Sequence, residues 1–217
     1  NVKGFYCGFC PERVNPGDKE HTIDKITKVI SGSNQNAIKK INNLYKSICK
    51  KIYISSSIKT AEAAKIIENT QRDINIALIN ELSKIFKLLN LDTREVLATA
   101  GTKWNFSKYF PGMVGGHCIG VDPYYLTYKS KSVGFKPNVI LAGRKINDGM
   151  SDYILKNIIK LYKKKNISFT KSRILFIGCS FKENVTDTRN SKSIELLEKL
   201  HKLKAKIDIL DQVINED

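Results

Sequence analysis

The segment Arg173-Ile174-Leu175-Phe176-Ile177 is an apolar run behind one arginine, and the turn Gly178-Cys179-Ser180 follows it directly. A short apolar run bounded by glycine predicts a buried strand. We expect a helix over about 190–203 and a further strand over 206–210, ahead of Asp211. Strand, helix and strand at this spacing predict a β-α-β unit of a parallel sheet.

The beginning of the chain shows the same alternation. We expect strands over 2–9, 26–30 and 52–54, and a helix over 34–51. Two prolines and a glycine within 10–18 mark a turn after the first strand. This order predicts the last part of an open parallel sheet.

Between these two patterns the chain is expected to be helical. Ser57 or Thr60 can cap a helix that runs as far as Leu89. Its apolar residues recur at helical spacing, at Ile67, Ile74, Leu78, Leu82, Ile85 and Leu89. A helix of about thirty residues is far longer than the mean of about 11–12. It predicts a domain spine, a subunit contact or both.

Shorter elements follow the long helix. Asp92 can cap a helix over 92–100, and residues 101–125 are expected to form a loop. A second helical stretch is expected over 136–165, passing through Gly149.

The expected fold class is α/β, in three parts. Residues 1–57 hold the end of a Rossmann-like parallel sheet, 58–168 form an all-helical domain around the long spine helix, and 169–217 begin a second Rossmann-like domain. Because residues 1–57 would contain only the end of the first sheet and 169–217 only the beginning of the second, we expect further sequence on both sides.

The chain of 217 residues has a formal net charge of +16, from 37 Lys and Arg against 21 Asp and Glu. Such an excess suits nucleic acid, an anionic membrane surface or phosphorylated substrates. Most of the cations are dispersed lysines, whereas nucleic-acid readers favour arginine. No apolar run approaches the ~20 residues that span a bilayer, and no signal peptide opens the sequence. We therefore expect no nucleic acid, no membrane and a cytoplasmic location.

The five cysteines are odd in number and irregularly spaced, so a disulfide framework is not expected. Cys7 and Cys10 form a Cys-x-x-Cys pair, which is typical of redox pairs and of half a zinc site. There is no second pair, and His21 is the one histidine nearby. We expect no metal.

The stretch 112–125, Gly-Met-Val-Gly-Gly-His-Cys-Ile-Gly-Val-Asp-Pro-Tyr-Tyr, places a cysteine among four glycines and a carboxylate four residues later. Glycines this close together allow positive φ angles or the close approach of a ligand. Cys118 is therefore either a displayed thiol or a buried structural one.

Lys65 and Asn69 are four residues apart on the expected long helix and share one face, with Arg72 close to it. The apolar stripe lies elsewhere on the helix. This face is either solvated, as most lysine-bearing faces are, or part of a site. Glu12, in a turn bracketed by prolines, has the same two interpretations.

Four motifs occur in a fixed order along nearly the whole chain. They are Pro11-Glu12-Arg13-x-x-Pro16-Gly17, Ala63-Ala64-Lys65-x-x-x-Asn69-Thr70, Gly115-Gly116-His117-Cys118-x-x-x-Asp122-Pro123 and Phe181-Lys182-Glu183-Asn184-x-x-Asp187-x-Arg189-Asn190-Ser191. Together they resemble the UDP-glucose/GDP-mannose dehydrogenase family. The sequence around the cysteine is similar to that of the family branch that acts on UDP-N-acetylhexosamines.

The resemblance implies an N-terminal NAD-binding Rossmann domain, a central helical domain and a C-terminal nucleotide-sugar domain. On this scheme 1–57 is the last part of the first domain, 58–168 is the central domain, and 169–217 begins the third. The Gly-x-Gly-x-x-Gly turn of a Rossmann first strand is absent from the sequence. NAD is the implied cofactor, and because most of its site would lie outside these residues, we expect no turnover by this chain alone.

The implied reaction takes a primary alcohol to a carboxylate with two hydride transfers and one water. Cys118 would hold the aldehyde as a thiohemiacetal, which a second oxidation turns into a thioester for water to hydrolyse. Lys65 and Asp122 would transfer protons and activate water. Asn69 would donate to the developing oxyanion, where Lys65 adds positive charge. Glu12 would position the hydrolytic water.

The resemblance also assigns binding residues. Those implied for the nucleotide sugar are Arg13, Val14, Arg72, Gly115, Phe181 and Lys182, with Lys103 as a further cation. Arg189 is implied at the NAD pyrophosphate and Cys10 on the cofactor side. Two positions depart from the family: Cys10 replaces the usual serine before Pro-Glu, and Phe110 replaces a basic residue before Pro-Gly. His117 is expected to be structural or near substrate, because adjacent loop residues such as His117 and Cys118 seldom point at each other.

The resulting prediction is an NAD-dependent 6-dehydrogenase of a UDP-N-acetylhexosamine, serving capsule or O-antigen polysaccharide. The alternative within this chemistry is a UDP-glucose or GDP-mannose 6-dehydrogenase. The alternative of another class is a basic helical interaction or nucleic-acid-binding module. A UDP-sugar is the expected substrate, and the long helix predicts a homodimer.

Overall fold

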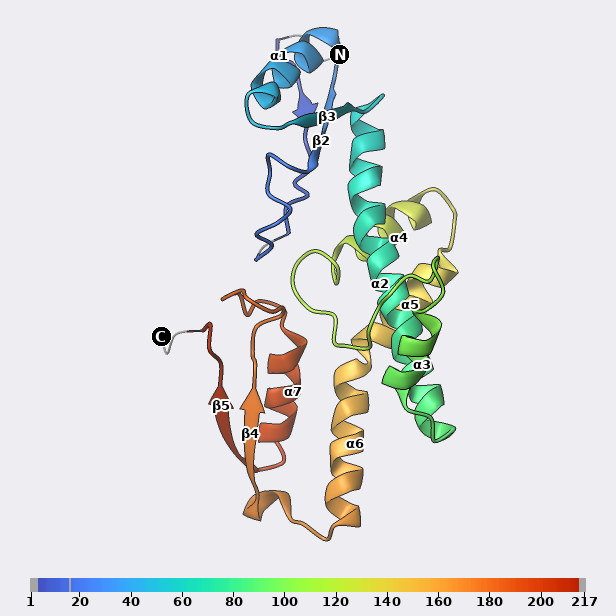
Figure 1. Ribbon diagram of the computed structural model, residues 1–217, viewed down its shortest axis with the longest axis vertical. Helices are drawn as coiled ribbons and strands as arrows, with labels where there is room; N and C mark the ends of the chain where they lie inside the picture. The colour runs from blue at the N-terminus through green and yellow to red at the C-terminus, as the bar shows by residue number, and fades with distance from the viewer. Residues whose placement is uncertain (1–3, 16, 215–217) are drawn as a thin grey trace. The chain divides into compact units, whose positions relative to one another are not determined.

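The computed structural model describes residues 4–15 and 17–214 (Figure 1). The chain divides into two compact units, Asn1–Glu68 and Asn69–Asp217. The elements, in chain order, are β1 (Gly8–Phe9), β2 (Thr27–Gly32), α1 (Gln35–Lys46), β3 (Lys51–Ile54), α2 (Ile58–Leu88), α3 (Thr93–Ala100), α4 (Asp122–Ser132), α5 (Asn138–Asp148), α6 (Met150–Lys164), the 3₁₀ helix η1 (Phe169–Lys171), β4 (Arg173–Ile177), α7 (Lys192–His201) and β5 (Lys206–Leu210). The α/β fold class is confirmed.

The first unit contains a three-stranded sheet in the order β1-β2-β3. The central strand β2 pairs with β3 in parallel, from Thr27 opposite Lys51 to Ile30 opposite Ile54, and with β1 antiparallel. Its Ile30 is fully buried. The predicted strand over 2–9 is confirmed only as the short β1, and residues 2 and 3 lie outside the described part of the chain.

The helix α1 connects β2 to β3, as a parallel pair requires. Asn34 caps its start, because the Asn34 side chain accepts a hydrogen bond from the backbone N–H of Ala37 at 2.9 Å. The prediction that this helix continues to Lys51 is wrong, since it ends at Lys46. The Ser47 hydroxyl donates to the carbonyl of Leu44 at 2.7 Å, and a short turn then leads into β3.

The helices of the second unit differ from the sequence prediction at two points. The continuous helix predicted over 136–165 is wrong: Gly149 is both the last cap of α5 and the first cap of α6, so the chain turns there. A glycine inside a helix costs about 0.5–1 kcal/mol relative to alanine, which makes it a natural break. The loop predicted over 101–125 ends early, at α4, whose first turn contains Pro123.

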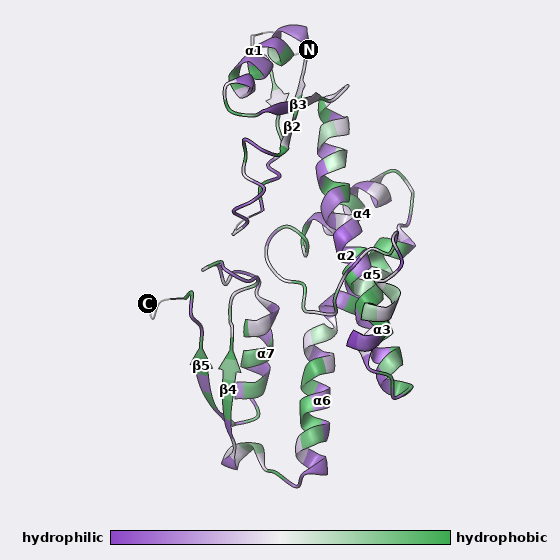
Figure 2. Cartoon of the chain, viewed as in Figure 1, coloured by the Kyte–Doolittle hydropathy of each residue, from purple (hydrophilic) through white to green (hydrophobic). Residues whose placement is uncertain are grey.

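The β4-α7-β5 unit matches its prediction closely. The two strands are parallel, with Arg173 opposite Lys206 and Ile177 opposite Leu210. Along β4 the residues alternate between half-buried and exposed, and its apolar character stands out in Figure 2. One face of this two-stranded sheet is therefore covered and the other is open.

The long helix α2 buries a polar face. Ile67, Leu78 and Ile85 of the predicted apolar stripe are 43–55 % exposed, whereas Asp73 and Asn80 are fully buried. Among the described residues, no helix is both long and apolar enough to cross a membrane.

Candidate active site

Cys118 lies in a turn that leads directly into α4. Its side chain is exposed, and its carbonyl oxygen accepts hydrogen bonds from the backbone N–H groups of Val121 and Asp122, at 3.1 and 2.8 Å. Residues 118–122 therefore form one helical turn, which separates the thiol from the Asp122 carboxylate by a single turn of the chain. The exposure favours the displayed-thiol interpretation of this stretch.

Asp122 is held by a residue of the long helix. The Asn69 side-chain amide donates to the Asp122 carboxylate at 2.6 Å, and Asn69 is only 8 % exposed. The hydrogen bond fixes the orientation of the carboxylate next to the Cys118 turn. The structure thus brings together two of the predicted catalytic residues from positions 53 apart in sequence.

Gly115 and Gly116 are needed for close packing against the segment that follows β4. A Cβ atom on Gly115 would lie 2.7 Å from the carbonyl oxygen of Asn190. One on Gly116 would lie 2.7 Å from the ring of Phe181, and Gly116 also has a φ of +78°. The Gly116 N–H donates to the Asn190 carbonyl at 3.2 Å. We call residues 112–121 the cysteine loop. These contacts hold it against the segment that contains the predicted substrate residue Phe181.

His117 points toward the same segment. Its ring packs edge-on against Phe181, with 5.5 Å between centroids, and its Nε2 lies 3.5 Å from the Asp187 carboxylate. Asp187 in turn accepts side-chain hydrogen bonds from Arg189 Nε and Nη2, which lower the pKa of Asp187 to about 2. These contacts give His117 partners other than Cys118, and its structural or near-substrate role stays a prediction.

In the first unit, Glu12 forms a turn with its own backbone. Its Oε1 accepts from the N–H groups of Val14 and Arg13, at 2.7 and 2.8 Å. The Val14 N–H is the largest cause of the lowered pKa of Glu12, and Lys28 adds to it from 3.5 Å. The carboxylate is therefore ionised at neutral pH. It can accept a hydrogen bond from water through Oε2.

Two further residues shape this turn. Lys28 is a buried lysine of β2, only 3 % exposed, and its ammonium group donates to the Pro11 carbonyl at 3.2 Å. Lys28 was not predicted as part of this turn, although a lysine inside an apolar strand is a signal that the sequence contains. Arg13 pairs with Glu68 at 2.9 Å, and burial raises the pKa of the half-buried Cys10 thiol.

The other predicted residues are distributed over both units. Lys65 is half-buried on α2 in the first unit, one helical turn before Asn69. Arg72 and Lys103 are exposed in the second unit. Lys182 lines a cleft of about 570 Å³ beyond the ends of β4 and β5, which is where parallel α/β sheets bind ligands. The convergence of Lys65 with Cys118 stays a prediction.

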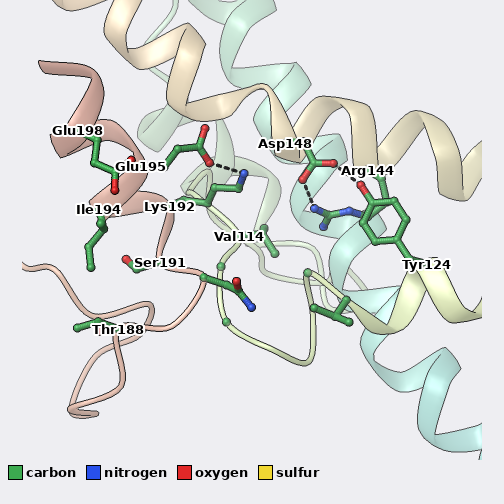
Figure 3. Close-up of a pocket in the computed structure, with 15 residues that line it drawn as sticks. Val114, Tyr124, Arg144, Asp148, Thr188, Ser191, Lys192, Ile194, Glu195 and Glu198 are labelled. Atoms are coloured by element: carbon green, nitrogen blue, oxygen red, sulfur yellow. Dashed lines mark hydrogen bonds and ion pairs between the residues drawn. The ribbon is translucent and has the colours of Figure 1, made fainter. Parts of the chain in front are cut away.

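A second cavity, of about 440 Å³, lies between the cysteine loop and the start of α7 (Figure 3). Lys192 pairs with Glu195 at 2.6 Å on one side of it. On the other side, the Tyr124 hydroxyl donates to the Asp148 carboxylate at 2.6 Å, and Asp148 also binds Arg144. In the two ion pairs, Lys192 with Glu195 and Arg144 with Asp148, each charged group lies beside a group of opposite charge.

A group of buried polar residues, of which Arg144 lines this cavity, was not predicted from the sequence. Asp73, Asn80 and Asn147 are fully buried and Arg144 is 3 % exposed. Asp73 and Asn80 are seven residues apart on α2, so they share one face. This spacing is the signal that could have found them, but a polar helix face is usually read as solvated. No group of three or more His, Cys, Asp or Glu side chains in residues 4–15 and 17–214 is arranged to hold a metal ion.

Two family models match the chain. The central domain of the UDP-glucose/GDP-mannose dehydrogenase family matches residues 59–149, and the UDP-binding domain of the same family matches residues 175–217. The chain belongs to the UDP-glucose/GDP-mannose dehydrogenase family, which confirms the resemblance seen in the motifs.

Similar proteins agree with this membership. The UDP-N-acetyl-D-glucosamine 6-dehydrogenase of Pseudomonas aeruginosa is 49% identical over 214 residues, which are 98% of this chain and 51% of that protein. Protein CapL of Staphylococcus aureus is 51% identical over 210 residues, 96% of this chain and 50% of that protein. The structure of a UDP-D-ManNAc dehydrogenase from Pyrococcus horikoshii superposes with a TM-score of 0.88 at 30% identity, covering 97% of this chain and 50% of that one. The chain spans about half the length of the curated relatives that it matches.

Proposed function

We propose that the protein containing this chain oxidises the C6 hydroxyl of a UDP-N-acetylhexosamine to the uronic acid, with NAD as the oxidant. Family membership and the names of the relatives support the reaction class. The observation that carries it is the 2.6 Å hydrogen bond between Asn69 and Asp122, one helical turn from the exposed Cys118. A thiol, a carboxylate and an amide donor at one place have the chemistry of a covalent aldehyde intermediate.

We propose that Cys118 is the nucleophile. Its thiolate adds to the carbonyl carbon of the aldehyde made by the first oxidation. The resulting thiohemiacetal oxyanion then loses a hydride, in the second oxidation, to become a thioester. Water then attacks the thioester, which releases the carboxylate and returns the thiol. Asn69 and Lys65 would stabilise the oxyanion, and Asp122 would accept the proton of the attacking water.

Glu12 would hold the hydrolytic water. Its Oε1 is occupied by two backbone N–H groups, so a water molecule would bind at Oε2, which also lies 3.5 Å from the Lys28 ammonium. Because its pKa is lowered, Glu12 would act as an acceptor and not as an acid. This is a positioning role for water, and it leaves the proton transfer to Asp122 and Lys65.

When bound, NAD supplies the hydride acceptor. Of the residues described, we propose Arg189 for its pyrophosphate, because the Arg189 side chain is 76 % exposed and a guanidinium matches phosphate geometry. Asp187 now pairs with that guanidinium and would have to yield to the phosphate. Cys10 would lie on the cofactor side of the first unit.

We propose that the nucleotide sugar is bound by the residues that the family resemblance implies, which are Arg13, Val14, Arg72, Lys103, Gly115, Phe181 and Lys182. The cleft beyond β4 and β5, lined by Phe181 and Lys182, supports a UDP site there. The exposed apolar residues of α2 support a homodimer through this helix. A relative named CapL supports a role in capsule polysaccharide.

The test is NADH formation by a chain of the relatives' full length that carries these 217 residues, with UDP-GlcNAc, UDP-GalNAc, UDP-ManNAc, UDP-glucose and GDP-mannose. We expect activity with a UDP-N-acetylhexosamine. Cys118→Ala should reduce acid formation by at least about 10⁴-fold, as loss of a covalent nucleophile does. Acid formation at the wild-type rate in that variant would refute the thioester route, and activity with UDP-glucose alone would select the alternative substrate.

A further inference from the structure

Gly112, the first residue of the cysteine loop, is held by a side chain of the long helix. The Asn80 amide donates to the Gly112 carbonyl at 2.9 Å, and the Gly112 N–H donates to the Asn80 carbonyl oxygen at 2.9 Å. Asn80 is fully buried. One primary amide that satisfies both backbone groups of a residue fixes the position and the direction of the chain at that residue.

Asn80 is itself held from α5. Its amide also donates to the Asn147 side-chain oxygen at 2.9 Å, and the Asn147 amide donates to the carbonyl and the carboxylate of Asp73, at 2.9 and 2.7 Å. All three residues are fully buried. The rotamer of Asn80 is therefore set by the packing of α2 against α5.

The same group of residues reaches the other end of the loop. Arg144 pairs with Asp73 at 2.6 Å and with Asp148, which accepts the hydroxyl of Tyr124 at 2.6 Å (Figure 3). Tyr124 comes two residues after Asp122. We call Asp73, Asn80, Arg144 and Asn147 the buried polar cluster. It binds Gly112 directly and reaches Tyr124 through Asp148, while Cys118 between these two residues is exposed.

We propose that Asn80 is a positioning residue for Cys118. It acts by holding Gly112, and the other members of the buried polar cluster keep Asn80 in place; we call this arrangement the clamp. An apolar core of the same volume would be at least as stable, because buried polar groups are costly to desolvate. What the polar side chains add is direction, since Asn80 hydrogen-bonds both backbone groups of Gly112 and Arg144 holds Asp148, which accepts a hydrogen bond from Tyr124. The catalytic consequence rests on the proposed function, whereas the clamp itself is measurable without turnover.

The clamp is tested with Asn80→Leu, which keeps the volume and removes both bonds to Gly112. The matched control is Asn75→Leu, on the same helix, where the amide donates to the Gln71 carbonyl of its own helix. Two quantities are measured under native conditions: hydrogen exchange of the Gly112 amide, and the rate of Cys118 alkylation by iodoacetamide, read by peptide mapping so that other cysteines do not contribute. We expect Gly112 exchange to accelerate at least about tenfold and the alkylation rate to change about threefold or more, with α2 amides unaffected.

Rates for both variants equal to wild type would overturn the proposal. So would equal changes in the two variants once they are compared at equal stability in urea. If Asn80→Leu does not fold, Asn80→Asp replaces it, because a carboxylate still accepts from Gly112 N–H but cannot donate to the Gly112 carbonyl. The Cys118 alkylation rate of Asn80→Asp is divided by the wild-type rate at the same pH. This ratio should approach one as the pH is lowered, because the protonated carboxyl can again donate to the Gly112 carbonyl. A ratio independent of pH would also overturn the clamp.

Turnover separates this proposal from the proposed function. In the full-length protein, Asn80→Asp should lower kcat about tenfold or more and change KM less than twofold, because the substrate contacts are left in place. An unchanged kcat would contradict the positioning role. If the wild-type protein oxidises no nucleotide sugar but the exchange and alkylation results hold, the proposed function fails and the clamp stands.

Discussion

Two Asp–Arg pairs contact the cysteine loop or the residues that hold it, and they differ mainly in their exposure to solvent. Asp73 pairs with Arg144 at 2.6 Å inside the protein, and Asp187 pairs with Arg189 at 2.7 Å with the arginine side chain 76 % exposed. Burial raises the pKa of Asp73 even though Arg144 opposes the shift. Hydrogen bonds from Arg189 lower the pKa of Asp187 to about 2. The same two groups at nearly the same distance thus behave in opposite ways, because desolvation outweighs attraction only in the interior.

The buried pair is also incompletely satisfied. Among the described residues, the Asp73 Oδ2 and Arg144 Nε atoms have no hydrogen-bond partner. Such atoms cost about 1–3 kcal/mol each when buried. The cluster is therefore not an optimal source of stability, which fits a role in fixing the loop.

The largest effect is expected from Asp73→Leu. It leaves Arg144 buried with Asp148 as its remaining carboxylate, and removing one partner of a buried pair costs about 3–5 kcal/mol. Urea denaturation measures the loss in the free energy of unfolding. Asp187→Leu is the matched control in the exposed pair and should change the unfolding midpoint far less. Equal losses in the two variants would contradict the difference drawn between the pairs.

The double variant Asp73→Leu with Arg144→Met sharpens this test. An apolar pair of similar volume should recover at least half of the lost free energy of unfolding, because no unpaired charge remains. The Gly112 amide should nevertheless stay less protected than in the wild type, since Asn147 has lost an acceptor. Full protection of Gly112 in the double variant would show that hydrogen bonds in the cluster do not hold the loop.

The second effect concerns the packing of the cysteine loop against Phe181. Gly116→Ala forces a side chain into positive φ and against the Phe181 ring, at 2.7 Å. We expect a loss of about 2 kcal/mol in the free energy of unfolding. Gly112→Ala is the control in the same loop, because a Cβ there meets no atom within 4 Å. A loss for Gly116→Ala no larger than that of its control would mean that the loop does not depend on this contact.

The third effect is smaller. Tyr124→Phe removes the hydroxyl that donates to Asp148 and leaves the ring, over which the Arg144 guanidinium lies at 5.4 Å. One hydrogen bond at a partly exposed site contributes about 1 kcal/mol. Thermal denaturation should show a lower Tm, and Cys118 alkylation should change less than in Asn80→Leu. A larger alkylation change than in Asn80→Leu would place the main anchor at the Tyr124 end of the loop.

The sequence predicted the elements that depend on local pattern. The strands 173–177 and 206–210 and the Asp92 cap were located to the residue, because apolar runs and capping side chains act over a few positions. The motif residues of the family were also visible, and the structure joins Asn69 to Asp122.

The parts that were missed depend on partners far away in sequence. Asn80 meets Gly112 across 32 residues, and Asp73 meets Asn147 across 74. On a helical wheel these polar side chains look like a solvated face, and only the packing of α2 on α5 turns that face inward. For the glycines of the loop the sequence predicted positive φ angles or the close approach of a ligand; Gly116 has the positive φ, and its packing against the Phe181 ring could not be read from the sequence.

The smallest effect is the acid dependence of Asp187. Its pKa is about 2 in the folded protein against an ordinary value of 3.8, so its ion pair stabilises the fold above about pH 4 and loses this contribution as the pH falls toward 2. Asp187→Asn should therefore flatten the decline of Tm between pH 4 and 2. Asp73 has the opposite sign, because its raised pKa makes its contribution fall as the pH rises through the folded value. An Asp187→Asn variant with the wild-type slope would mean that Arg189 does not hold the carboxylate in solution, and the contrast between the two pairs would then rest on Asp73 alone.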